Sequence, residues 1–280
     1  MANDFGIDSH KLSLHPERVS QWLKWGDNWE KAKKIYPIYV EISPSGLCNH
    51  SCSFCGLDFT PQNKAVFLEA SILKGCLSEM ANLGVKSVMF AGEGEPLLHK
   101  DMAEITVHAK KTGIDTAFTT NATCLTEKFC NKAIGSIEWI KVSINAGTTE
   151  TYAKIHNAPK SHFELVLRNI VSAVKIRDEQ KSFCVIGVQA ILLPDNKNEM
   201  EILAKLARNI GCSYLVIKPY SQHPLSVTKK YKNASFQQDE MKNLEEALSR
   251  INGNDFKVIF RRQTMERISK GRTYSKCYST

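Results

Sequence analysis

The chain has 280 residues, of which 42% are hydrophobic and 24% are charged, and its formal net charge is +8. These values are typical of one large globular domain with a full core. No apolar run approaches the roughly 20 residues that span a bilayer, and the polar start Met1-Ala2-Asn3-Asp4 is not a signal peptide. We therefore expect a cytoplasmic location, no membrane partner and reduced thiols at the nine cysteines. The mild positive charge either favours an anionic substrate or only keeps the protein soluble.

The N-terminal segment predicts a short helix. Trp22, Trp25 and Trp29 recur at spacings of three and four residues, which places their indoles on one helical face. We expect residues 1–35 to form a helical extension whose tryptophans pack on the main domain. Lining a substrate entrance is the alternative role for these side chains.

The next segment joins a strand, predicted over residues 38–42, to a loop rich in cysteine. Cys48, Cys52 and Cys55 follow one another in the spacing C-x3-C-x2-C. Thiolates are soft ligands that suit iron–sulfur clusters or zinc. A closed structural zinc site has four protein ligands, whereas a set of three leaves one metal position open, as in catalytic sites. The loop therefore predicts an open metal site. The alternatives are a zinc knuckle completed by His50 or a distant cysteine, and a chance cluster of thiols.

This spacing, with the aromatic Phe54 before the last cysteine, resembles that of the radical SAM superfamily. The resemblance implies that Cys48, Cys52 and Cys55 hold a [4Fe–4S] cluster whose fourth iron binds S-adenosylmethionine. It also implies that one electron from the reduced cluster cleaves S-adenosylmethionine to a 5′-deoxyadenosyl radical, which abstracts hydrogen from a substrate. The cofactors would carry this chemistry while the protein, Phe54 included, orients them. An electron donor such as flavodoxin or ferredoxin is an implied partner.

The remaining chain alternates strand patterns with helical patterns. The predicted strands are residues 87–91, 115–119, 139–144, 184–192 and 214–217, and the predicted helices are residues 69–83, 100–111, 127–133, 162–177, 197–209 and 237–251. This alternation predicts right-handed βαβ units and a parallel sheet. Composition alone does not separate a partial barrel from an open doubly wound sheet. The superfamily resemblance implies an α/β fold with a partial (β/α)6 TIM-like barrel, and we expect the radical SAM core at residues 36–252.

Residues just after the strands carry further resemblances, and ligands bind at these ends in such folds. Gly92, Glu93, Gly94 and Glu95 resemble the superfamily segment G-G-E-P, which receives the ammonium group of S-adenosylmethionine. Glu93 departs from that pattern, so either carboxylate is a candidate, and we favour Glu95 because Pro96 follows it. An ordinary glycine-rich turn with solvated acids is the alternative.

Three more positions are candidates for binding S-adenosylmethionine. Asn121 lies in a segment similar to T-N-G and either bonds the ligand or caps the next helix. Ser143 and Asn145 resemble the S-x-D/N-G segment that contacts the ribose and carboxylate, and their spacing of two places both side chains on one strand face, with turn capping as the alternative. Arg168, in the following helix, either reaches the methionyl carboxylate or faces solvent.

The candidate substrate residues follow the sixth strand. They are Lys218, Tyr220, Gln222 and His223. The alternative is a loop whose polar side chains satisfy one another.

The C-terminal segment predicts one more strand over residues 255–260. In relatives with a SPASM or twitch extension, a cysteine at the distance of Cys277 begins the binding of an auxiliary iron–sulfur cluster. We expect residues 253–280 to be the truncated start of such an extension, with a second cluster if the chain continues; a stray thiol is the alternative. The cysteines expected to be core thiols are Cys76, Cys124, Cys130, Cys184 and Cys212.

The sequence therefore predicts a radical SAM enzyme that cleaves S-adenosylmethionine reductively and begins radical modification of a substrate. That substrate is a peptide or protein, a sugar or another small molecule. A glycyl-radical activase is disfavoured because no extra cluster insert stands near the cysteine loop. The alternative from another class is a non-catalytic zinc-binding scaffold with nucleic acid on its basic surface; under the main hypothesis no nucleic-acid partner is expected.

Overall fold

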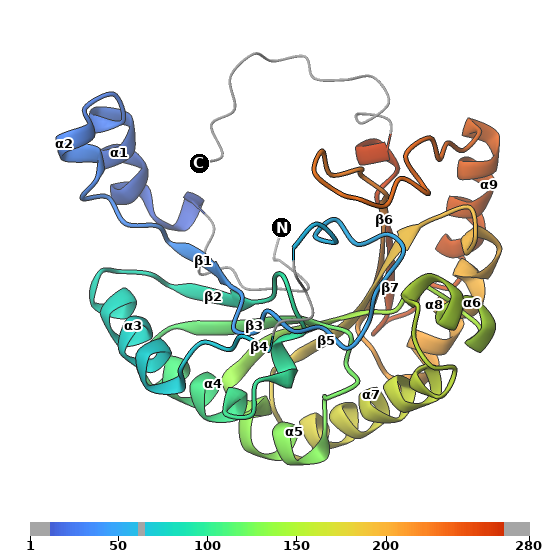
Figure 1. Cartoon of the computed structure of the whole chain (residues 1–280), viewed down its shortest axis with the longest axis horizontal. Coiled ribbons are helices and arrows are strands. Elements are labelled where there is room, and N and C mark those ends of the chain that lie inside the picture. Colours follow the sequence, from blue (N-terminus) through green and yellow to red (C-terminus); the bar gives the residue numbers. More distant parts are fainter. Residues whose placement is uncertain (1–11, 61–64, 266–280) are drawn as a thin grey trace. The chain divides into compact units, whose positions relative to one another are not determined.

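A computed structural model describes residues 12–60 and 65–265 of the chain (Figure 1). The strands are β1 (Tyr39–Ile42), β2 (Ser87–Phe90), β3 (Asp115–Thr120), β4 (Ile137–Ser143), β5 (Val185–Leu192), β6 (Tyr214–Pro219) and β7 (Lys257–Phe260). The helices are α1 (Pro16–Trp25), α2 (Trp29–Ala32), α3 (Ala70–Asn82), α4 (Met102–Lys111), α5 (Glu127–Ala133), α6 (Thr149–His156), α7 (Ser161–Glu179), α8 (Met200–Ile210) and α9 (Gln238–Ser249). Short 3-10 turns are η1 (Leu12–Leu14), η2 (Pro96–Leu98), η3 (Ile134–Ser136) and η4 (Lys197–Glu199).

The strands form a seven-stranded sheet in which neighbours along the chain are neighbours in the sheet, in the order β1 to β7. The pairing is parallel, and Tyr39–Ile42 of β1 faces Ser87–Phe90 of β2 residue for residue. In the described part of the chain β1 and β7 are the two end strands, so the sheet is open. The predicted partial TIM-like barrel is confirmed, and the strand predicted near residues 255–260 extends its sheet as β7.

The chain divides into two compact units. The first comprises Met1–Asn49, Pro61–Val142 and Arg168–Ile186, and the second comprises His50–Thr60, Ser143–Leu167 and Gly187–Thr280. The boundary passes through the cysteine loop, so that Cys48 belongs to the first unit while Cys52 and Cys55 belong to the second.

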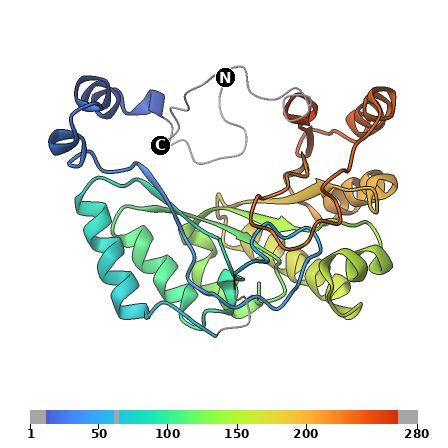
Figure 2. The ribbon, with the colours of Figure 1, turned by 45° about the horizontal axis from the view of Figure 1, so that its top comes forward.

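In the first unit, α3, α4 and α5 lie side by side on one side of strands β1 to β4 (Figures 1 and 2). The core beneath them is apolar and aromatic: Phe90 of β2 and Phe118 of β3 are fully buried, with ring centroids 5.2 Å apart. Phe129 of α5 meets Phe118 edge-on at 5.6 Å. Crossover helices on one side are what a barrel requires, because a doubly wound sheet would place them on both sides.

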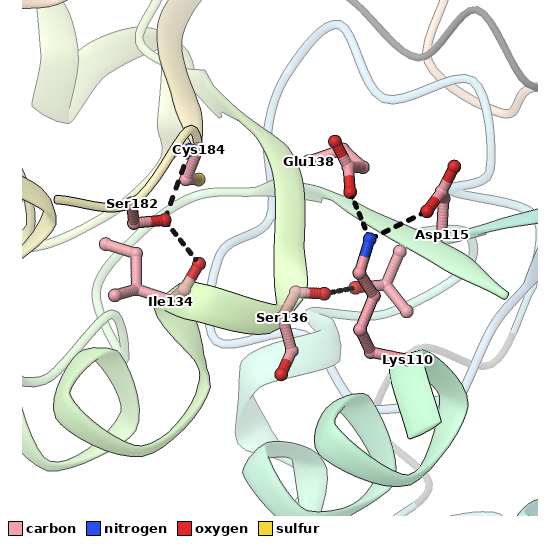
Figure 3. A network of polar contacts seen from close by, with 8 residues as sticks. Lys110, Asp115, Ile134, Ser136, Glu138, Ser182 and Cys184 are labelled. Atoms are coloured by element: carbon pink, nitrogen blue, oxygen red, sulfur yellow. Dashed lines mark hydrogen bonds and ion pairs between the residues drawn. The ribbon is translucent and has the colours of Figure 1, made fainter. Parts of the chain in front are cut away.

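Polar contacts connect residues at the N-terminal ends of the strands in this unit (Figure 3). Lys110 Nζ lies 2.8 Å from Asp115 Oδ1 and 2.5 Å from Glu138 Oε1. Ser182 Oγ donates to the carbonyl oxygen of Ile134 at 3.0 Å. In barrel folds, residues at the N-terminal ends of the strands contribute to stability and not to catalysis. Partly exposed ion pairs of this kind each contribute little to the free energy of unfolding. The functional candidates lie at the opposite ends of the strands.

In the second unit, α8 packs on β6, and α9 contacts both α8 and β7. The buried face of α8 is formed by Met200, Leu203, Ala204 and Ala207. Gly211 ends this helix with φ of +92°, a left-handed conformation that glycine adopts without steric cost. Across the described residues, no helix has the length and apolar character needed to cross a bilayer.

The prediction of a single tryptophan-lined helix near the N-terminus is wrong. Helix α1 ends at Trp25, and α2 begins at Trp29 after Asn28, whose side chain accepts a hydrogen bond from the Lys31 backbone N–H at 3.3 Å. Trp22 and Trp25 therefore belong to one helix and Trp29 to another. Trp22 is 42% exposed and Trp29 is 72% exposed, so neither side chain is a core residue.

Candidate cofactor site

The segment after β2 packs its backbone against the chain that leads into the cysteine loop. A Cβ at Gly94 would overlap the carbonyl oxygens of Ser45 and Leu47, and the Glu95 backbone N–H donates to the Leu47 oxygen at 2.9 Å. Gly92 has φ of +116° and lies against Ser43. Glycine is required here because the two backbone segments touch. In the described structure the close approach is therefore to the residues before Cys48.

Glu95 is buried, with 3% of its surface exposed. Its carboxylate accepts hydrogen bonds from Thr120 Oγ1 at 2.5 Å and from the backbone N–H groups of Asn121 and Leu97 at 2.7 and 3.1 Å. Burial raises the pKa of Glu95 to about 7, against the opposing effect of these three donors. Glu93, the other candidate, is exposed to solvent.

Asn121 connects the end of β3 to the cysteine loop. Its Nδ2 donates to Asn49 Oδ1 at 2.7 Å, and its Oδ1 accepts from the Thr123 backbone N–H at 2.9 Å. Asn49 Nδ2 in turn donates to Thr123 Oγ1 at 2.7 Å. The suggested helix-capping role is wrong, because the cap of α5 is Thr126. Asn121 instead closes an Asx turn beside the residue that follows Cys48.

Ala122 stands where the T-N-G pattern has glycine. Its φ of +60° is left-handed, which explains why a glycine suits this position. The backbone is held there by Asn169, whose Nδ2 donates to the carbonyl oxygens of Ala122 and Thr123 at 2.8 and 3.0 Å. This chain therefore keeps the turn geometry despite the departure from the pattern.

The second unit holds the rest of the cysteine loop against the last turn of α6. The backbone N–H groups of Ser51 and Ser53 donate to the carbonyl oxygens of His156 and Ile155 at 3.3 and 2.8 Å. These carbonyls would otherwise lack partners, since the last turn of a helix leaves its acceptors open. Between the cysteines, the Cys55 backbone N–H donates to the Cys52 oxygen at 3.0 Å, which closes a turn.

Helix α6 is not among the elements that the sequence predicted. Its eight residues begin after Thr148, whose Oγ1 accepts from the Thr151 backbone N–H. The Glu199 carboxylate anchors this end by accepting from the backbone N–H groups of Gly147 and Thr148 at 2.8 and 3.1 Å. A negative charge is favourable at a helix N-terminus. A cap of the type Thr-x-x-Thr is a sequence signal that could have located the helix.

His156, at the end of α6, is the functional candidate that sequence reasoning missed. It is 1% exposed, and its ring stacks on Tyr152 with centroids 4.3 Å apart. Its Nδ1 lies 3.2 Å from Cys52 Sγ, and its Nε2 lies 3.3 Å from Asn145 Nδ2. Burial lowers the pKa of His156 to about 3, so the imidazole is neutral. Phe54 meets the same ring edge-on at 5.4 Å.

His50 lies beside His156, with ring centroids 5.4 Å apart. Its Nε2 lies 3.0 Å from His162 Nδ1, and burial lowers the pKa of His50 to about 4. The other nitrogen, His50 Nδ1, is buried and has no hydrogen-bond partner among the described residues. The ligand atoms of His50, Cys52 and His156 lie within 4.8 Å of one another. The cysteine loop and the end of α6 therefore bring side chains of metal-binding residue types close together.

The remaining cofactor candidates differ in their burial and in their hydrogen bonds to the protein. Asn145 is 1% exposed, and its Oδ1 accepts from the Ile191 backbone N–H at 2.6 Å. Ser143 is half-buried at the end of β4, and Arg168 is exposed on α7.

The substrate candidates form part of a loop network in the second unit. Tyr220 donates from its hydroxyl to Gln222 Oε1 at 2.9 Å, and Gln222 Nε2 donates to the carbonyl oxygen of Thr228 at 3.2 Å. His223 stacks on Phe59 with ring centroids 5.1 Å apart. Lys218 is half-buried in β6. The loop is tied to the cysteine loop by the Asp58 carboxylate, which accepts from the backbone N–H groups of Val227 and Thr228.

A cavity of about 420 Å³ lies beside this loop in the second unit. Of the four substrate candidates, only Tyr220 is among its described lining residues, which are Pro219, Tyr220, Ala234, Ser235, Phe236, Gln238, Asp239, Met241, Lys242, Arg262 and Met265. Its lining combines aromatic, sulfur-containing and charged side chains.

An open parallel barrel, with a three-cysteine loop after its first strand, is the architecture of one enzyme class. The chain belongs to the radical SAM superfamily, whose family model matches residues 42–207. The cofactors of this class are a [4Fe–4S] cluster and S-adenosylmethionine, as the sequence predicted. The zinc-binding scaffold is therefore not favoured.

Several curated relatives are named "Probable GTP 3′,8-cyclase". One from Saccharolobus islandicus is 25% identical over 214 residues, which cover 76% of this chain and 65% of the relative's own length. One from Pyrobaculum aerophilum is 29% identical over 171 residues, which cover 61% of this chain and 54% of the relative's own length. The chain thus spans less than two thirds of the length of these relatives.

Solved structures share the fold. Streptococcus suis SuiB bound to the precursor peptide SuiA aligns with a TM-score of 0.64 and 16% identity, covering 86% of this chain and 53% of SuiB. Native anSMEcpe with bound AdoMet aligns with a TM-score of 0.59 and 18% identity, covering 85% of this chain and 68% of that protein. At these identities the likeness concerns the fold.

Proposed function

We propose that this chain carries the catalytic core of an enzyme that cleaves S-adenosylmethionine reductively and begins a radical modification of a substrate. The observation that carries the proposal is the cysteine loop that leaves β1 in a chain of the radical SAM superfamily. Cys48, Cys52 and Cys55 would hold the [4Fe–4S] cluster, and all three are half-buried. When bound, the cluster and S-adenosylmethionine supply the electron transfer and the organic radical.

The other cofactor residues fall into two groups, which are buried residues bonded to the protein and residues with exposed surface. Glu95, Asn121 and Asn145 are buried and bonded to protein groups, so we propose that they position the backbone around the cofactors. Glu93 is exposed and Ser143 is half-buried, so we propose that they contact the ammonium and ribose of S-adenosylmethionine.

Four further residues complete the proposed set. Gly92 and Gly94 keep the segment after β2 close to the cysteine loop, Phe54 packs on His156, and Arg168 remains a proposed partner of the methionyl carboxylate.

The substrate proposal follows the relatives. Their name refers to GTP, and the net charge of +8 suits an anionic small molecule, so GTP is the first substrate to test. A peptide is the second, as in the peptide-bound SuiB structure, although that likeness concerns the fold. A flavodoxin or ferredoxin is the proposed electron donor. The proposed SPASM or twitch extension depends on Cys277, which lies outside the described residues.

Anaerobic reconstitution with iron and sulfide tests the cofactor assignment. We expect about four irons per chain, as a [4Fe–4S] cluster requires, and a reduced-state EPR signal that shifts when S-adenosylmethionine is added. Bound zinc with no response to S-adenosylmethionine would contradict the proposal. A second cluster signal would support an auxiliary site at Cys277.

Replacement of Lys218 by alanine tests the substrate residues. We expect Lys218→Ala to retain substrate-independent formation of 5′-deoxyadenosine, because Lys218 is proposed to contact the substrate and not S-adenosylmethionine. Product formation from whichever compound proves to be the substrate should fall about tenfold, the usual scale of one lost charged contact. Lys205→Ala, which removes an exposed lysine of α8, is the matched control. Equal loss of both products would instead indicate a role in binding S-adenosylmethionine.

A further inference from the structure

Four groups of the second unit form one continuous chain of polar contacts. The Ile191 backbone N–H donates to Asn145 Oδ1 at 2.6 Å, Asn145 Nδ2 lies 3.3 Å from His156 Nε2, and His156 Nδ1 lies 3.2 Å from Cys52 Sγ. Asn145 and His156 are each 1% exposed, so water cannot readily replace these partners. The contact between His156 and Cys52 joins residues that are 104 positions apart in the sequence.

The direction of each hydrogen bond follows from the first one. A backbone N–H can only donate, so the atom of Asn145 that faces Ile191 must be the oxygen. The amide nitrogen of Asn145 then faces His156 and donates to Nε2. A neutral imidazole with an accepting Nε2 carries its proton on Nδ1. His156 Nδ1–H therefore donates to Cys52 Sγ.

The packing around His156 holds the ring in this orientation. Tyr152 stacks on one face, and the rings of Phe54 and His50 approach edge-on at 5.4 Å each. The carboxylate of Glu199 fixes the N-terminus of the same helix. A protonated Nδ1 has no lone pair for a metal, so this geometry also opposes His156 as a zinc ligand at that atom.

We propose that His156 is a positioning residue that donates a hydrogen bond to the Cys52 thiolate and thereby raises the reduction potential of the cluster. The inference rests on the proposed ligation by Cys52. Hydrogen bonds to cluster sulfurs are among the factors that set the potential, because a donor stabilises the more negative, reduced state. Asn145 does not contact Cys52 but fixes the His156 tautomer that carries its proton on Nδ1, as the hydrogen-bond partners of ligating groups do at other metal sites.

A redox titration followed by EPR tests the proposal on the reconstituted enzyme. We expect His156→Leu to lower the equilibrium constant for one-electron reduction about tenfold, which corresponds to a potential about 59 mV more negative. His156→Asn is the rescue variant, because its amide nitrogen can occupy the place of Nδ1, and its potential should return toward that of the unaltered enzyme. Equal potentials in the unaltered enzyme and His156→Leu, with equal iron content, would overturn the proposal.

A measurement on the unaltered sequence covers the case in which His156→Leu does not assemble a cluster. Enzyme labelled with ¹⁵N in histidine should show a weak hyperfine coupling of ¹⁵N to the reduced cluster, and an exchangeable proton that disappears in D₂O. The absence of both couplings would overturn the proposal. If the unaltered protein binds no cluster, the proposed function fails together with the role of His156. If it binds a cluster that shows neither coupling, only the role of His156 fails.

Discussion

We expect alanine at Cys48, Cys52 or Cys55 to abolish formation of 5′-deoxyadenosine from S-adenosylmethionine. Each replacement leaves two protein thiolates for a cluster that is proposed to need three, and no other described cysteine lies in the loop. The measurement is 5′-deoxyadenosine by mass spectrometry after anaerobic reconstitution, together with iron content. We expect activity at the background level in each variant.

The matched control is Cys76→Ala. Cys76 is exposed on α3, so the expectation that it is a core thiol is wrong. It lies away from the cysteine loop in the sequence, and its loss should leave both iron content and activity unchanged. Full activity in any one of the three loop variants would contradict the assignment of that cysteine as a ligand.

The second large effect concerns the pH dependence of stability through Glu95. Burial raises its pKa from the ordinary 4.5 to about 7, so the folded protein holds this proton more tightly than the unfolded chain. The stabilising contribution of protonated Glu95 is present below about pH 4.5 and is lost as the pH rises through about 7. The difference corresponds to about 3 kcal/mol of unfolding free energy.

Glu95→Gln removes this titration. We expect the stability of the unaltered protein, relative to Glu95→Gln, to fall by about 3 kcal/mol between pH 4.5 and pH 8, measured by urea denaturation of the cluster-free protein. Glu93→Gln makes the same change on an exposed side chain of the same segment and should follow the unaltered protein. Parallel pH profiles for Glu95→Gln and the unaltered protein would contradict the raised pKa.

Local sequence was sufficient to locate most of the strands and helices. Apolar strands that alternate with helical patterns predicted β2 to β6 and most of the intervening helices to within a few residues, because hydrophobic periodicity reflects which face of each element is buried. It missed α6, and it failed for the tryptophans, where a capping Asn28 restarts the helix.

The candidate site was predictable only where its residues are consecutive. The spacing of Cys48, Cys52 and Cys55 is a property of the sequence alone, and it led to the superfamily and its cofactors. The sequence also located Glu95, although not that the Glu95 carboxylate is turned into the protein and bonded to β3.

Only the tertiary structure decided which groups surround these residues. The pairing of His156 with Cys52, and of Asn121 with Asn49, joins positions that are distant in the sequence, and no local pattern encodes such contacts. Burial likewise depends on the whole fold, and it is burial that raises the pKa of Glu95 and lowers that of His156. The sequence by itself predicted the kind of cofactor, because the spacing of its three loop cysteines resembles that of one superfamily. The fold decided the hydrogen bonds to those side chains, because these arise only when distant segments are packed together.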